Sequence, residues 1–262
     1  MRTEHLSSYL ARLVLACMAP LLLLALWMAW DHVQEREALH LREGQHAAAN
    51  YASAVDQYLD ARIKALHMLA RSPLVLDPRA WPHLYAEAQE FQHSFGTHVI
   101  FADSLGQMLF NTRTPYGSHL PQLPRSKGRS AAPLALETGL PQVGDIVQGP
   151  VAMRPLVAVV VPTVQEGKAT HLMLTTLETV QLQQGLEKIA LPDGWAMQLR
   201  DSTGASIAQR LPAKFDSRSD VETDHRFVAP LQHAGWSVVV EIPNATHAAL
   251  MFRIATTLAL GI

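Results

Sequence analysis

The longest apolar stretch of the chain covers residues 13–30 and contains no charged side chain. A helix of this length can cross the hydrocarbon core of a bilayer, which is about 30 Å thick. Arg2 and Arg12 precede the stretch, whereas Asp31 and Glu35 follow it, so the positive-inside rule predicts a cytoplasmic N-terminus. A cleaved signal peptide is the alternative, but its apolar core would be shorter and a cleavage site with small residues would follow. We therefore expect an uncleaved transmembrane helix.

Residues 31–70 carry the apolar period of one long helix. Tyr51, Val55 and Leu66 belong to positions that recur every three or four residues, as expected when one face of a helix is buried. Frequent alanines favour the helix, and Pro73 ends it. Two interpretations remain: a dimeric coiled-coil stalk, or a spine on which globular modules pack. A helix of about 60 Å favours a homodimer in both cases.

The apolar period changes from helical to alternating after a second predicted helix at residues 78–94. Short apolar runs then alternate with turns that contain Gly, Asp or Pro, which indicates antiparallel strands. Residues 114–133 are rich in Pro, Gly and Ser, and they predict a loop. The predicted strands are residues 98–102, 107–111, 156–163, 171–177, 195–199, 205–208, 226–231 and 236–242, another strand begins at residues 143–146, and further helices are predicted at residues 131–138 and 178–191.

One hairpin pattern occurs twice in the chain. The segments IFADSLGQMLFN and QLRDSTGASIAQ both place Asp-Ser-x-Gly between two apolar strands. A turn with Asp and Gly between such strands is typical of a β-hairpin. Internal repetition of this kind predicts two stacked modules of one type. We expect a membrane-distal module at residues 71–178 and a membrane-proximal module at residues 179–243.

Residues 244–262 start as a helix and end in an uncharged run that follows Arg253. This run, residues 254–262, is too short to cross a bilayer. We expect that the chain stops within a second transmembrane helix, as the N-terminal portion of a longer protein. A natural end at the membrane surface is the alternative.

The order of these elements resembles the double-Cache extracellular sensor domains of bacterial histidine kinases and diguanylate cyclases. Three stretches carry the resemblance, which covers about residues 31–243: LARSPLVLDPRAWPHLY, VIFADSLGQMLFNTRTPYGSHLP and TGLPQVGDIVQGPVAMRPLVAVVVPT. The resemblance implies an α+β fold. In it, a long N-terminal helix accompanies two tandem PAS-like (Cache) antiparallel-sheet modules, and transmembrane helices flank them.

The resemblance also places a small-molecule ligand in the distal module, between its sheet and the loops above. By their positions in the matching stretches, the residues expected near this pocket are Trp81, Tyr85, Phe101, Asn111, Arg113 and Asp145. A guanidinium such as that of Arg113 can hold a carboxylate through two hydrogen bonds, and Asp145 can meet an ammonium group. Arg113 and Asp145 can instead be solvated or pair with each other, and Asn111 can instead cap the turn after its strand.

Composition and charge argue against several other functions. A net charge of -2 gives the chain no electrostatic footprint for nucleic acid. The 13 histidines form neither H-E-x-x-H nor H-x-H, so no metal site is expected. The chain has no G-x-S-x-G and no P-loop, and its single cysteine, Cys17, lies in the apolar stretch. We therefore expect no catalytic residue, no cofactor and no internal disulfide.

Together these features predict a small-molecule sensor in a bacterial inner membrane, with residues 1–12 in the cytoplasm and residues 31–243 in the periplasm or outside the cell. The signal would pass to a cytoplasmic output domain that this chain does not contain, a histidine kinase first or a diguanylate cyclase next. This stretch itself is expected to be no enzyme. The alternative is a membrane-anchored structural or protein-interaction module without a small-molecule ligand.

Overall fold

The computed structural model describes residues 24, 27–28, 41–212 and 223–243. The two predicted transmembrane helices, residues 13–30 and 244–262, lie outside the described residues except for three positions of the first. Those three, Leu24, Trp27 and Met28, are helical and exposed. No helix among the described residues combines the length and the apolar character that a membrane crossing requires.

The chain divides into two units, Met1–Gly44 and Gln45–Ile262. Residues 41–44 of the first unit are helical. The second unit contains all of the strands that the structure describes, and the description that follows concerns this unit alone.

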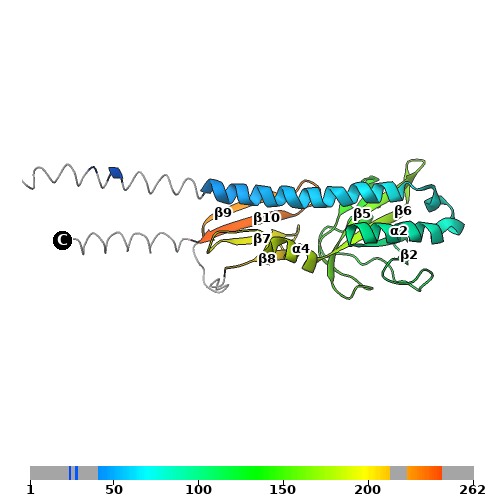
Figure 1. The fold of residues 1–262 in the computed structure, drawn as a ribbon. Coiled ribbons are helices and arrows are strands. Elements are labelled where there is room, and N and C mark those ends of the chain that lie inside the picture. Colours follow the sequence, from blue (N-terminus) through cyan, green and yellow to red (C-terminus); the bar gives the residue numbers. More distant parts are fainter. Residues whose placement is uncertain (1–23, 25–26, 29–40, 213–222, 244–262) are drawn as a thin grey trace, which may run out of the picture. The chain divides into compact units, whose positions relative to one another are not determined.

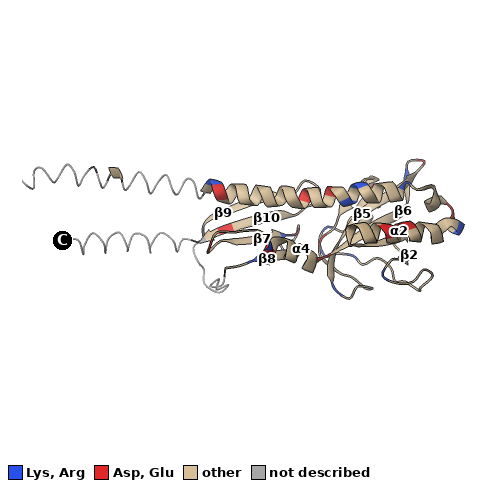
Figure 2. Cartoon of the chain, in the orientation of Figure 1, with Lys and Arg blue, Asp and Glu red and all other residues tan. Residues whose placement is uncertain are grey.

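A long helix, residues 45–70, lies along the second unit and appears blue to cyan in Figure 1. Its apolar face, which includes Tyr51, Val55 and Leu66, is buried in one core with residues of both sheets. Charged residues of both signs occur along this helix (Figure 2). The helix is therefore packed along its length, as the spine interpretation predicts. It ends at Ala70, and Pro73 opens the short 3₁₀ helix η1 (Pro73–Leu76).

The first sheet has six antiparallel strands. Five of them are ordered β2-β1-β6-β5-β3, and β4 pairs with β5 beside β3. The strands are β1 (His98–Asp103), β2 (Met108–Asn111), β3 (Gln142–Val143), β4 (Val147–Gln148), β5 (Pro155–Gln165) and β6 (Lys168–Glu178). The helices of this part are η2 (Pro78–Ala80), α2 (Trp81–Phe95) and α3 (Ala131–Thr138).

The two faces of the first sheet are covered by different elements, because successive side chains of a strand point to opposite faces. Phe101, Phe110 and Met173 belong to the core that contains the long helix. Ile100 and Leu174 belong to a second core, which includes residues of α3 and of the loop before it. Any site between the sheet and the loops must therefore lie on this second face.

The second sheet has four antiparallel strands in the order β8-β7-β10-β9. They are β7 (Ala196–Arg200), β8 (Ser206–Arg210), β9 (Thr223–Pro230) and β10 (Ser237–Pro243), and α4 (Thr179–Glu187) joins the first sheet to the second. The side chain of Gln183 on α4 makes hydrogen bonds with the backbone N–H and C=O of Gln209 on β8. Helix α4 is thus attached to the second sheet although it follows directly from the first.

The repeated hairpin is confirmed in both sheets. Asp103 accepts hydrogen bonds from the backbone amides of Leu105 and Gln107, at 2.9 and 2.8 Å. Asp201 accepts the equivalent bonds from Thr203 and Ala205, both at 2.9 Å. In each turn one carboxylate oxygen binds the N–H groups that the hairpin leaves unpaired, which explains why Asp begins both turns.

Most predicted helices and strands agree with the structure, and two differ in a way that matters. The predicted strand at residues 143–146 is interrupted, because the backbone amide of Asp145 donates to Arg129 and not to a neighbouring strand. This interruption separates β3 from β4. The helix predicted at residues 178–191 is shorter, since α4 ends at Glu187 ahead of Pro192.

Candidate ligand-binding site

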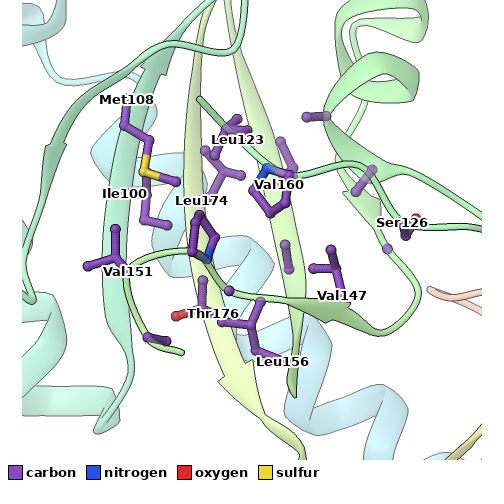
Figure 3. Close-up of a pocket in the computed structure, with 18 of the residues that line it drawn as sticks. Ile100, Met108, Leu123, Ser126, Val147, Val151, Leu156, Val160, Leu174 and Thr176 are labelled. Carbon is purple, nitrogen blue, oxygen red and sulfur yellow. The ribbon is translucent and has the colours of Figure 1, made fainter. Parts of the chain in front are cut away.

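A cavity of about 50 Å³ lies on the face of the first sheet that turns away from the long helix. Its floor is formed by strand residues such as Ile100, Val160 and Leu174, and its walls by the loops around Leu123 and Val151 (Figure 3). A water molecule needs roughly 10–15 Å³ measured in this way, so the cavity has room for about three to five waters. The space fits a ligand of a few heavy atoms.

The lining is predominantly apolar, and small residues at its rim leave the free space. Ala131 and Ala132 at the start of α3, together with Gly144 and Ala152, line the cavity with minimal side chains. Gly149 is also required to be small, since a Cβ there would come within 2.5 Å of Leu156. An apolar cavity with few polar groups is the usual form of a small-molecule site.

Three of the six predicted site residues line this cavity: Asn111, Arg113 and Asp145. Arg113 follows the end of β2 and donates from Nη2 to Oε1 of Glu178 at 2.7 Å. Arg154 donates to the other oxygen of Glu178 at 3.2 Å. The predicted alternative, a pair between Arg113 and Asp145, is therefore replaced by a pair between Arg113 and Glu178.

The charges at this end of the cavity do not balance. Two guanidinium groups face the single carboxylate of Glu178, and the hydrogen bond from Arg113 lowers the pKa of this carboxyl, with a further contribution from Arg154. His98 lies beside them, and burial, followed by the positive charge of Arg113, lowers its pKa. The two guanidinium groups and the single carboxylate leave this cluster one positive charge in excess.

Asn111 is 2% exposed and has the capping role that the sequence offered as the alternative to ligand binding. Its Oδ1 accepts the backbone amide of Arg113 at 3.0 Å, so it caps the turn that follows β2. Among the described residues its Nδ2 has no hydrogen-bond partner, and the residue lines the cavity. The cap fixes the position of Arg113, while the amide nitrogen remains a donor for the cavity.

Thr176, on β6, is a cavity residue that sequence reasoning missed. It is 4% exposed, and its hydroxyl has no hydrogen-bond partner within the part of the chain that the structure describes. Buried polar atoms in folded proteins are nearly always paired, so such an atom at a cavity wall indicates a place for a ligand or water. The sequence alone does not give the strand register, which places Thr176 opposite His98 and Ala158.

Asp145 lies at the wall of the same cavity and is 2% exposed. Its Oδ2 accepts the backbone amide of Arg129 at 2.5 Å and the hydroxyl of Ser202, and its Oδ1 accepts the backbone amide of Ser202 at 3.1 Å. Three donors from the protein thus take three of the roughly four acceptor sites of this carboxylate, and one site of Oδ1 is left. Its contact with an ammonium group stays a prediction.

The remaining three predicted residues, Trp81, Tyr85 and Phe101, pack in the core of the opposite face of the sheet. The Phe101 ring lies edge-to-face with Trp81 at 5.5 Å and stacks on His171 at 5.1 Å. Tyr85 donates its hydroxyl to the carbonyl of Thr114 at 2.9 Å. The structure does not bring these aromatic residues to the cavity, because α2 covers the face that also packs on the long helix.

No group of three or more His, Cys, Asp or Glu side chains within the described ranges could hold a metal ion. The donors that line the cavity are instead suited to an organic ligand with an acceptor group.

No protein-family model matches the chain, and no match was found among curated proteins. Solved structures do match. The ligand-binding domain of the Pseudomonas fluorescens chemoreceptor CtaA, in complex with L-isoleucine, has a TM-score of 0.59 at 12% identity, covering 84% of this chain and 98% of its own. The corresponding domain of PctB from Pseudomonas aeruginosa, in complex with L-Gln, has a TM-score of 0.56 at 15% identity, covering 84% and 98%.

The sensor domain of the V. cholerae histidine kinase DctB has a TM-score of 0.55 at 11% identity, covering 80% of this chain and 99% of its own. Identities in this range establish the fold and leave the ligand open. The chain therefore has the mixed helix and antiparallel-sheet fold of the Cache-type ligand-binding sensor domains of chemoreceptors and histidine kinases, which confirms the resemblance at the level of fold.

Proposed function

We propose that residues 31–243 form the periplasmic sensing module of a bacterial transmembrane signalling protein, and that the cavity of the first sheet binds its small-molecule ligand. The observation that carries the proposal is the buried, unpartnered hydroxyl of Thr176 at the wall of a cavity that Arg113 also lines. Both groups can donate to a ligand, and water or a ligand is needed to satisfy the hydroxyl. The ligand complexes named for CtaA and PctB support the same kind of role.

The proposal includes the finer architecture expected from the sequence. The six-stranded sheet with α2 and α3 is the membrane-distal PAS-like module, residues 71–178, and the four-stranded sheet is the proximal module, residues 179–243. Transmembrane helices at residues 13–30 and 244–262 would flank them, with a cytoplasmic N-terminus and a homodimeric assembly. The output would be a histidine kinase, or a diguanylate cyclase as the next choice.

Signalling would use two arrangements of the module whose populations a ligand shifts. The hydrogen bonds between Asp145 and Ser202 join the cavity wall to the second sheet. A ligand that favours one position of this wall would therefore favour one position of the second sheet. Shifts of about 1–2 Å are the usual scale for helices that transmit such changes.

A thermal-shift screen of the chain in lipid nanodiscs tests the proposal. Amino acids, organic acids and polyamines are added singly, and at least one is expected to raise the midpoint of unfolding in the wild type, since a ligand that binds only the folded state stabilises it. The increase should disappear in Thr176→Val, which keeps the shape of the side chain. If no compound in a broad screen raises the midpoint, the membrane-anchored interaction module becomes the better explanation.

A further inference from the structure

The donors at the cavity share one property: they match an anionic acceptor. Arg113 carries the guanidinium, Asn111 offers Nδ2, and Thr176 offers an unpartnered hydroxyl, all on the floor or at the end of the same cavity. Only Nη2 of the Arg113 guanidinium has a hydrogen-bond partner among the described residues. A carboxylate can accept hydrogen bonds from several such donors at once.

The charge near these donors favours the same class of ligand. Arg113 and Arg154 share Glu178, so one positive charge is left without a counter-ion in this cluster. The Glu178 side chain is only 14% exposed, and the Arg113 side chain 19%. The Arg154 side chain is 67% exposed, so solvent screens its charge, and a ligand carboxylate gains mainly from the less exposed Arg113.

The cavity offers no comparable place for an ammonium group. Asp145 is the only carboxylate among the described lining residues, and the donors from Arg129 and Ser202 take three of its roughly four acceptor sites. An α-amino acid would therefore bury an ammonium whose three N–H groups meet at most one remaining acceptor site of Asp145. Leaving a buried charge unpaired costs more than leaving a neutral group unpaired.

The remainder of the cavity is apolar and small. Ile100, Met108, Val160 and Leu174 surround a space that holds roughly three to five waters. This space suits a short alkyl chain next to one polar head, and it is too small for a long side chain without movement of the surrounding loops.

We propose that this cavity selects short aliphatic monocarboxylates, such as propionate or butyrate, over the corresponding α-amino acids. The inference rests on the proposed sensing function, and it specifies the ligand class of the same site. The ligand carboxylate lies on Arg113, Asn111 and Thr176, and its alkyl chain lies on Ile100 and Leu174. Glu178 competes with the ligand for Arg113 and yields part of that contact when the ligand binds.

Isothermal titration calorimetry of the full chain in nanodiscs tests this with three matched probes. Propionate is L-alanine without its ammonium group, and ethylamine is L-alanine without its carboxylate. Propionate should bind at least about tenfold more tightly than L-alanine, the factor expected for one unpaired polar group, and ethylamine should not bind. L-alanine that binds as tightly as propionate, or more tightly, would overturn the inference and leave the sensing function standing.

Four variants separate a direct contact from a general loss of folding. Arg113→Met should weaken propionate binding by about a hundredfold, and Thr176→Val by about tenfold, while Glu178→Gln should tighten it by about tenfold because the competing charge is gone. Arg79→Met, an exposed arginine on η2, is the matched control and should bind propionate like the wild type. Thr176→Val is the more secure test, because its hydroxyl has no hydrogen-bond partner among the described residues to lose.

Three further outcomes are decisive. If another compound class binds in the thermal-shift screen while propionate and butyrate do not, the carboxylate inference is wrong and the sensing function is retained. If propionate binds equally well to the wild type, Thr176→Val and Arg113→Met, it binds elsewhere and the inference is also wrong. If no compound binds at all, the sensing function itself fails.

Discussion

Ser202, in the turn between β7 and β8, donates both its backbone amide and its hydroxyl to the carboxylate of Asp145 at the cavity wall. A third hydrogen bond joins the same two segments, from the backbone amide of Ile146 to the Asp201 carboxylate at 3.4 Å. The turn of the second sheet is therefore docked on the loop that separates β3 from β4. Ser202 and the equivalent residue of the first hairpin, Ser104, are both exposed, so the two differ in the hydrogen bonds to Asp145 and not in exposure.

We expect the substitution of Ser by Ala to lower the free energy of unfolding by different amounts at these two positions. Ser202→Ala removes a hydrogen bond to a buried carboxylate and should lower the free energy of unfolding by about 1.5–3 kcal/mol. Ser104→Ala occupies the same position of the other hairpin and should change it by no more than about 0.5 kcal/mol. Urea unfolding followed by tryptophan fluorescence measures both, and equal effects would refute the docking of the second turn.

We expect the substitution of Gly by Ala to change the free energy of unfolding in opposite directions at two positions. A Cβ at Gly128 would collide with the Asp145 carboxylate and with the Thr203 methyl group, so Gly128→Ala should lower the free energy of unfolding by about 1–3 kcal/mol. Gly185 lies in α4 with open space around its Cα, and Gly185→Ala should raise it by about 0.5–1 kcal/mol. The same denaturant titration compares the two variants, and a stabilising Gly128→Ala would show that the carboxylate has room to move.

Leu66 of the long helix is fully buried, so we expect its truncation to destabilise the protein strongly. Leu66→Ala should lower the free energy of unfolding by about 2–5 kcal/mol, through lost burial and the cavity that remains. Met68, two residues further along the same helix, is 78% exposed, and Met68→Ala should change it by at most about 0.5 kcal/mol. Similar small effects at both positions would mean that this part of the helix does not pack on the sheets.

Glu178 predicts a pH dependence of stability with a defined sign. The hydrogen bond from Arg113 lowers its pKa in the folded protein below the ordinary value of 4.5, against the raising effect of burial. The unfolded chain then binds more protons, so the contribution of Glu178 is fully present above about pH 4.5 and is lost as the pH falls through the lower folded pKa.

Glu178→Gln removes this contribution. The variant should be less stable than the wild type near pH 7, and the difference should shrink as the pH falls below about 4.5 and through the lowered folded pKa of Glu178. Unfolding titrations at several pH values give the comparison. Glu137→Gln, at an exposed position on α3, provides the control and should show no such convergence. A difference that is constant with pH would assign the effect of Glu178 to shape alone.

The sequence predicts the hairpins and Arg113 because their signals are local. Asp103 and Asp201 mark their turns through bonds to amides only two and four residues away. Arg113 stands out as a cation just after a predicted strand. Such features depend on neighbours along the chain, and they survive without knowledge of the fold.

The aromatic residues and Thr176 depend on information that is not local. The period of residues 81–95 shows that α2 has an apolar face but not which face of the sheet it covers. The sequence alone therefore does not show that Trp81, Tyr85 and Phe101 pack on the face opposite the cavity. In the sequence, Thr176 is one more β-branched residue of a predicted strand. Only the register with β1 and β5 gives its neighbours in the sheet, among which its hydroxyl has no hydrogen-bond partner within the described residues.

Glu178 is the last residue of β6, and α4 begins at the next peptide unit. The carboxylate that holds Arg113 and the first turn of the helix attached to β8 are thus joined covalently, with no intervening linker. At this junction the backbone itself can transmit a displacement, without contacts between side chains. A displacement of Glu178 would therefore reach the start of α4 through the backbone, so this junction gives Arg113 a covalent connection to the second sheet beside the bonds of Asp145 to Ser202.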